Sequence, residues 1–98
     1  QIPDARLSLL PPSLFTSKRV LDLGCNAGKL TMECMSHLGA KGARGIDLDP
    51  YLIADAQRLM EEAKVEGCEF AEVDFMKEGY FEGRKEAGEE YDVIFLLR

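Results

Sequence analysis

Residues 20–31, Val-Leu-Asp-Leu-Gly-Cys-Asn-Ala-Gly-Lys-Leu-Thr, contain the pattern that decides the fold of this chain. The stretch begins as a short apolar strand and passes through a turn bounded by Gly24 and Gly28, whose missing Cβ atoms permit close approach. Asn26, between them, belongs to the residue types that tolerate a positive φ. From Leu30 onward the apolar spacing changes from two residues to about 3.6, which is typical of a helix. We therefore predict a strand, a tight turn and a helix, with a ligand held against outward-pointing N–H groups at the helix N-terminus.

Three kinds of glycine-rich loop compete for this turn. The dinucleotide fingerprint G-x-G-x-x-G needs glycines where the chain has Asn26 and Lys29. The phosphate loop G-x-x-x-x-G-K-[ST] needs a longer spacing than the three residues between Gly24 and Gly28, and Leu30 stands where its magnesium-binding hydroxyl belongs. The third kind is a looser Gly-x-x-x-Gly turn after an Asp-Leu-Gly strand end. A turn that only connects a strand to a helix is the remaining alternative.

Length and composition limit the function classes. The chain has 98 residues, enough for one domain at most, and a net charge of −6, which argues against a basic nucleic-acid or membrane-surface patch within it. It has no signal peptide and no apolar span of membrane length. Cys25, Cys34 and Cys68 are odd in number and lack metal-ligand spacing, so we expect reduced thiols, no metal and an intracellular protein. Because the chain starts at Gln1 and stops at Arg98 directly after an apolar run, we expect a piece of a longer protein.

A second strand and helix follow the glycine turn. Residues 43–48 form the predicted strand, and Asp49-Pro50 is a strong helix start, with Asp as N-cap and Pro at the first position. We expect Gly67 to end this helix. Asp47 lies at the carboxyl end of the strand, where a carboxylate accepts hydrogen bonds from ribose hydroxyls, and we prefer it to Asp49 for that role. The predicted buried stripe of the helix comprises Ile53, Ala56, Leu59, Met60 and Ala63.

Two further strands complete the pattern. Residues 68–73 form the third, followed by Asp74 and Phe75, which are either an adenine-reading acid and its neighbour or a loop acid and a core ring. After a polar connection, residues 91–97 form the fourth, and its continuous apolar run predicts burial on both faces, as in a parallel sheet. Alternating strands and helices predict a doubly wound α/β fold. Right-handed crossovers then bring the glycine turn, Asp47, Asp74 and Leu97 to one edge, at the carboxyl ends of the strands.

At this level the chain resembles the first half of a class I S-adenosylmethionine (SAM) methyltransferase. Residues 20–28 resemble motif I, residues 45–48 motif II, and residues 91–94 the opening of motif IV. The resemblance implies a Rossmann-like doubly wound parallel sheet and SAM as cofactor. It also implies that residues 1–98 are the N-terminal part of a SAM-binding methyltransferase domain.

A narrower resemblance is to the methylphosphate capping enzymes, the bicoid-interacting family of RNA 5′-phosphate methyltransferases. The lead-in R-L-S-L-L-P-P-S-L-F at residues 6–15 and the run VLDLGCN-x-G-x-LT match that family in order and spacing. The chain departs from it at Lys29, where histidine is frequent, and at Asp74, where asparagine is common. By this resemblance the cofactor-binding residues are Arg6, Gly24, Cys25, Asn26, Gly28, Asp47, Leu48, Asp74, Phe75 and Leu97.

The same resemblance implies a role for most of these residues. Arg6 would meet the cofactor's carboxylate, and Gly24, Cys25 and Asn26 would line its methionine part. Asp47 would bind the ribose. Leu48, Asp74 and Phe75 would border the adenine, and Leu97 would lie near the sulfonium.

The implied activity is methylation of the 5′-terminal phosphate of a small RNA, in the nucleus or cytoplasm. An anionic phosphate oxygen needs no general base, and we assign no catalytic residue. Two alternatives remain open: a methyltransferase acting on a protein, a small molecule or a base nitrogen, and a noncatalytic domain that keeps the fold as an interaction module.

Overall fold

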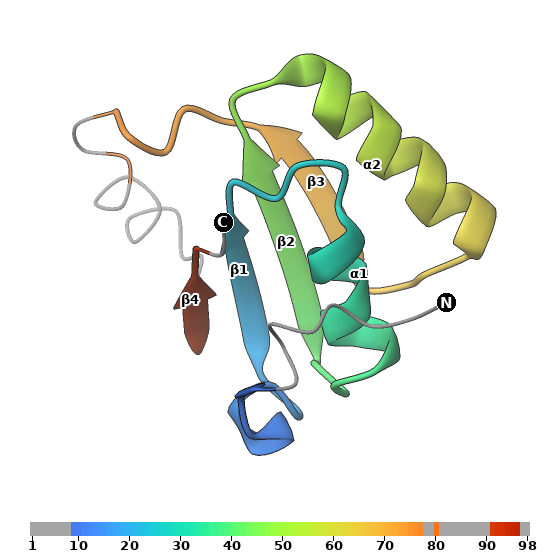
Figure 1. The fold of residues 1–98 in the computed structure, drawn as a ribbon, viewed down its shortest axis with the longest axis vertical. Coiled ribbons are helices and arrows are strands. Elements are labelled where there is room, and N and C mark those ends of the chain that lie inside the picture. Colours follow the sequence, from blue (N-terminus) through green and yellow to red (C-terminus); the bar gives the residue numbers. More distant parts are fainter. Residues whose placement is uncertain (1–8, 78–79, 81–90, 97–98) are drawn as a thin grey trace.

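A parallel four-stranded sheet forms the centre of the computed structural model, which describes residues 9–77, 80 and 91–96 (Figure 1). The strand order is β3-β2-β1-β4, and every neighbouring pair is parallel. This arrangement confirms the predicted doubly wound parallel sheet. The strands are β1 (Arg19–Leu23), β2 (Gly42–Asp47), β3 (Cys68–Glu72) and β4 (Val93–Phe95).

Two helices, α1 (Lys29–Ser36) and α2 (Pro50–Ala63), pack on the same face of this sheet. The register places Val20 of β1 beside Ala43 of β2, and both belong to a buried cluster that includes Leu30 and Cys34 of α1. Ala43 pairs with Cys68 of β3. Phe70 follows Cys68 by two residues and so lies on the same face of the sheet, where it packs against α2. Consecutive right-handed crossovers in one direction produce this one-sided layer.

Local signals explain how α2 begins. The Asp49 carboxylate accepts the N–H groups of Tyr51 at 2.9 Å and Leu52 at 3.4 Å, and Pro50 occupies the first turn. The helix end differs from the prediction, because α2 stops at Ala63, with Lys64 in the left-handed conformation at its C-cap, three residues before Gly67. The Lys64 N–H donates to the Glu61 carbonyl, so the last turn closes on itself before Gly67 is reached.

The buried stripe of α2 is shorter than predicted. Ile53 and Ala56 are buried and Met60 is half-buried, but Leu59 is 38% exposed and Ala63 is exposed. Figure 1 shows the reason: the C-terminal half of α2 extends beyond the edge of β3, where no strand lies beneath it.

Burial along the strands follows their place in the sheet. Three consecutive residues of β1 are buried, so this central strand is covered on both faces. The same expectation for the fourth strand is wrong in the described chain, since Ile94 and Leu96 are each 49% exposed. The reason is that Ile94 alternates with Val93 and Phe95, which pack in the cluster on the helix side, so Ile94 lies on the opposite face, where no helix of the described residues packs.

The apolar core divides into two neighbouring clusters. One surrounds Phe15, which follows the short 3₁₀ helix η2 (Pro12–Leu14) and contacts the ring of Phe95 edge-on, with centroids 5.9 Å apart. The other lies directly beneath the glycine turn and comprises Cys25, Ile53, Ala56 and Phe70.

Candidate functional site

The turn between β1 and α1 adopts the backbone conformations that its glycines predicted. Gly24, Asn26 and Gly28 all have positive φ angles, of 71°, 52° and 85°. The value at Asn26 confirms the prediction that asparagine replaces a glycine here because it tolerates this region. The result is a tight glycine turn, residues 24–28, that leads directly into α1.

Four N–H groups of this turn are bonded within the chain. Those of Gly24 and Cys25 both donate to the Ile46 carbonyl at 2.9 Å, and that of Gly28 donates to the Cys25 carbonyl at 2.9 Å. The N–H of Asn26 donates to the Asp47 carboxylate at 2.9 Å. These four groups are therefore not free donors. The outward-pointing N–H groups expected at the helix N-terminus belong to the residues that open α1, from Lys29, and that expectation stays a prediction.

Asp47 joins the glycine turn to the next loop. Its Oδ2 accepts the Asn26 N–H at 2.9 Å, while its Oδ1 accepts the N–H of Asp49 at 3.0 Å. Each oxygen of an ionised carboxylate has two acceptor positions, so these two bonds leave one position on each oxygen. Asp47 is half-buried at the carboxyl end of β2, and the pair of remaining positions suits two adjacent hydroxyl groups.

An apolar side chain stands beside this carboxylate. Leu48 is 62% exposed, although it follows a buried strand directly. The end of β3 lies against the same point, because the Val73 N–H donates to the Asp47 carbonyl at 2.9 Å. The carboxyl ends of β1, β2 and β3 thus meet around Asp47, as the topology predicted.

Asp74 and Phe75 follow at this edge. The Asp74 Oδ1 accepts the N–H of Met76 at 3.1 Å, which closes a small turn, and Asp74 itself is exposed. Phe75 is half-buried and Met76 is 82% exposed. These residues follow β3 at the carboxyl edge of the sheet, and the part of Asp74 and Phe75 in cofactor binding stays a prediction.

Cys25 and Gly28 face the core instead of the crevice. The Cys25 side chain is 5% exposed and packs among Ile53, Ala56 and Phe70, so a ligand on the turn would meet its backbone. Gly28 is buried as well. Arg6 and Leu97, the other two predicted cofactor residues, lie outside the described residues.

Asp22 is a structural partner of the turn that the sequence reading did not include in the site. It is 1% exposed, and its Oδ2 accepts the Thr31 hydroxyl at 2.6 Å. The bond ties β1 to the first turn of α1 underneath residues 24–28. The available signal was the acid within an otherwise apolar strand, because a buried carboxylate requires hydrogen-bond partners.

The three thiols surround this buried acid. Burial, with a smaller contribution from the negative charge of Asp22, raises the pKa of Cys25, Cys34 and Cys68 from 9.0 to about 12 in each case. These cysteines are free and protonated at neutral pH, as expected for a reduced protein. In the part of the chain that the structure describes, no group of acids, histidines and cysteines is arranged to hold a metal ion. Neither of its helices has the length and hydropathy to cross a membrane.

Two clefts lie away from the crevice. One, of about 360 Å³, opens at the amino ends of the strands and includes Arg19, Arg44 and Tyr91 in its wall. The other, of about 480 Å³, runs between α1 and α2 and includes Met32 and Leu59. Neither of these two clefts lies at the carboxyl ends of the strands, which is where sheets of this topology bind their ligands.

Comparison with known proteins now identifies the family. Residues 14–97 match the family model described as a methyltransferase domain. The chain belongs to this methyltransferase domain family. It also superimposes on the RNA methyltransferase from Salinibacter ruber, crystallised with S-adenosyl-L-homocysteine, with a TM-score of 0.71. That likeness covers 97% of this chain and 60% of the other at 24% identity, and it confirms the Rossmann-like fold.

Two curated relatives are similar in sequence. The U6 snRNA methylphosphate capping enzyme Amus of Drosophila melanogaster is 40% identical over 63 residues, which are 62% of this chain and 21% of that protein. The 7SK snRNA methylphosphate capping enzyme of Mus musculus is 44% identical over 55 residues, which are 56% of this chain and 8% of the relative. The matched segments therefore span a small part of these longer proteins.

Proposed function

We propose that this methyltransferase domain binds SAM in the crevice at the carboxyl edge of the sheet and transfers its methyl group to the 5′-terminal phosphate of an RNA. The observation that carries the proposal is the Asp47 carboxylate, which holds the glycine turn through the Asn26 N–H at 2.9 Å and keeps two acceptor positions. A ribose diol is the complementary donor pair, because its two adjacent hydroxyls need two nearby acceptors.

The surrounding residues fit an adenosyl sulfonium compound better than a nucleotide. SAM has no phosphate, and the N–H groups of Gly24, Cys25, Asn26 and Gly28 are bonded within the chain, so none of these four is a free donor for a phosphate. Exposed Leu48 supplies an apolar surface beside the ribose acceptor, suited to one face of an adenine ring. Asp74 and Phe75 would border the other side of that ring, and Arg6 and Leu97 complete the proposed set.

The RNA substrate is proposed from the relatives and from chemistry. Both curated relatives named above are methylphosphate capping enzymes of small nuclear RNAs, and the lead-in at residues 6–15 resembles that family. A phosphate oxygen is anionic at neutral pH, so its methylation requires no side chain to remove a proton. An enzyme that modifies such RNA ends would act in the nucleus or the cytoplasm.

The contribution of the described residues to the reaction is binding and orientation. Bound SAM supplies a methyl group on a sulfonium, which is transferred by in-line displacement to the acceptor oxygen. Asp47 anchors the nucleoside through its ribose, and the glycine turn provides a backbone surface close to the sheet. Holding the two reactants in line is a large part of the catalysis available to such a reaction, because the leaving group is already activated.

The direct test is methyl transfer by the full-length protein. Radiolabelled SAM is supplied with one RNA prepared in three forms: triphosphate-ended, monophosphate-ended and dephosphorylated. We expect label on a phosphate-ended RNA and none on the dephosphorylated form. The labelled phosphate should resist a phosphomonoesterase, because its terminal oxygen is blocked by a methyl ester. Label on all three RNAs would indicate a base nitrogen as acceptor, and label in protein or a small molecule would indicate those substrates. Each of these results would contradict the proposed acceptor.

A separate measurement distinguishes the enzyme from a noncatalytic module. Calorimetry of the full-length protein with SAM is expected to show binding. Absence of binding would support the interaction module and overturn the proposed cofactor.

A further inference from the structure

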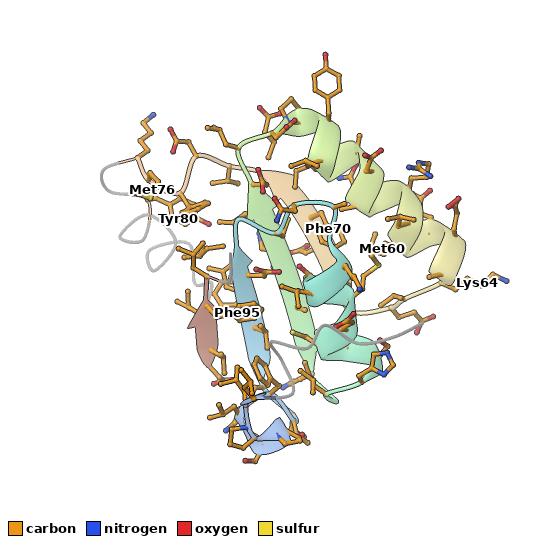
Figure 2. All side chains as sticks on the ribbon, in the orientation of Figure 1. Met60, Lys64, Phe70, Met76, Tyr80 and Phe95 are labelled. Carbon is orange, nitrogen blue, oxygen red and sulfur yellow. The ribbon has the colours of Figure 1, made fainter. Side chains whose placement is uncertain are left out.

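Phe70, in the middle of β3, occupies the space that side chains at two glycines would need. A Cβ atom added at Gly28 would lie 2.6 Å from the ring atom Cζ of Phe70, and one added at Gly45 would lie 2.8 Å from Cδ1 and Cε1. The Phe70 side chain is 6% exposed, and it is labelled near α2 and the glycine turn in Figure 2. Its ring therefore extends from β3 over β2 and reaches the start of α1.

The backbone of Gly45 gives no other reason for a glycine there. Gly28 has a φ of 85°, which by itself favours glycine, but Gly45 is not among the glycines of positive φ. It lies inside β2, directly between Asp22 of β1 and Phe70 of β3 in the sheet register. A glycine within a strand often marks a close approach of another group. Here two groups approach, because a Cβ at Gly45 would lie 2.8 Å from the Cβ of Cys25 as well as 2.8 Å from the ring of Phe70.

The Phe70 ring lies just beneath the hydrogen bond between Asn26 of the turn and Asp47 of β2. Gly45 precedes Asp47 by two residues, Gly28 follows Asn26 by two, and Asn26 donates to Asp47 at 2.9 Å. The ring also approaches α2, because a Cβ at Gly28 would be 2.9 Å from the Ala56 Cβ as well. Phe70 thus fills the space shared by β2, α1 and α2 immediately below the proposed cofactor crevice.

From this packing we infer that Phe70 is a positioning residue, which sets the height of the glycine turn above β2 and so aligns Asn26 with Asp47 for cofactor binding. The inference deepens the proposed function and rests on it for the identity of the cofactor. A smaller side chain leaves space into which the turn can sink, because the Phe70 ring is the group that a Cβ at Gly28 would approach most closely. Misplacement by about 1 Å is enough to lower the performance of an oriented site up to about a hundredfold.

The test combines Phe70→Leu with Gly45→Ala in the full-length protein. We expect Phe70→Leu to weaken SAM binding by about tenfold to a hundredfold, because the displaced turn no longer aligns Asn26 with Asp47. Gly45→Ala alone is expected to weaken binding too, because its Cβ meets the ring of Phe70 and the Cβ of Cys25. In the double variant the contact with the ring is relieved while the contact with Cys25 remains, so the loss of affinity should be smaller than the sum of the two single losses, a coupling typical of residues in contact.

Phe15→Leu is the matched control. Phe15 is a phenylalanine 1% exposed in the other cluster, so its truncation lowers stability through a comparable cavity without touching the turn. At a temperature where all variants are folded, we expect Phe15→Leu to bind SAM as the wild type does. Equal losses in the two variants, or additive effects of Phe70→Leu and Gly45→Ala, would overturn the inference.

A readout without SAM separates this inference from the proposed function. Hydrogen exchange at the Asn26 amide reports its bond to Asp47. We expect faster exchange in Phe70→Leu, a less than additive change in the double variant, and no change in Phe15→Leu. If the wild type failed to bind SAM, the proposed function would fail while this exchange pattern still tested the role of Phe70. Unchanged exchange in Phe70→Leu would overturn that role.

Discussion

Asp47 and Asn26 lie 21 residues apart in the chain, yet the carboxylate of the first accepts the N–H of the second at 2.9 Å. This bond joins the end of β2 to the turn after β1. It gives one side chain two tasks, support of the turn and presentation of acceptors to a ribose. Removing the carboxylate should therefore affect both the crevice and its ligand.

Asp47→Ala should weaken SAM binding by the full-length protein at least about tenfold, since a lost hydrogen bond to a charged group is worth about 1.5–3 kcal/mol. Calorimetric titration measures the change. Asp49→Ala is the control: it removes the N-cap of α2 and should lower the free energy of unfolding by about 1 kcal/mol without a matching loss of affinity. A stronger effect on binding at Asp49 than at Asp47 would reverse the assignment of the ribose ligand.

Thr31→Val should destabilise the fold by about 1–3 kcal/mol, because the buried Asp22 carboxylate loses the donor that lies 2.6 Å away. Urea unfolding measures this. Asp22→Asn in the Thr31→Val background should be less harmful than the sum of the two single changes, because the residues are in contact. Additive effects would show that the pair does not act as a unit.

The raised thiol pKa values predict both low reactivity and a loss of stability in alkali. In the folded state Cys25, Cys34 and Cys68 titrate near 12 instead of 9.0, so the unfolded chain releases thiol protons first as the pH rises. Their contribution to stability is fully present below pH 9.0 and is lost between there and about 12. Urea midpoints measured across this range should fall, and less steeply in Cys68→Ala. Iodoacetamide should alkylate the native protein far more slowly than the denatured one.

Lys64→Gly should stabilise the domain by up to about 1 kcal/mol, because Lys64 has a φ of 55° at the C-cap of α2, a conformation that suits glycine. Thermal unfolding is the measurement. The same replacement at Glu61, inside α2, should destabilise by about 1 kcal/mol. Because Lys64 lies far from Asp47 along α2, its variant should leave SAM affinity unchanged, and a loss of affinity there would contradict the placement of the crevice.

Much of this site follows from local rules. The positive φ of Asn26, the N-cap at Asp49 and the strand–turn–helix order of residues 19–36 all depend on neighbours in the chain. The place of Asp47 at the edge could also be predicted, since parallel strands separated by single helices bring their carboxyl ends together.

Other features depend on contacts between distant residues. The sequence pattern predicted a longer buried stripe on α2 and two covered faces for the fourth strand, but α2 extends past β3 and no helix of the described residues packs on the second face of β4. Apolar periodicity shows which residues can be buried. Which of them are buried in the fold depends on the helices and strands that pack against them.

The sequence by itself determined the order of strands and helices, the glycine turn and the edge at which its acid lies, because these follow from spacing and backbone preference. Only the tertiary structure decided that four N–H groups of the turn are bonded internally, that Asp22 supports α1 through Thr31, and that the Phe70 ring and the Cys25 Cβ together leave no space for a side chain at Gly45. Each of these is a contact across strands, and its geometry exists only once the sheet has set the distance between them.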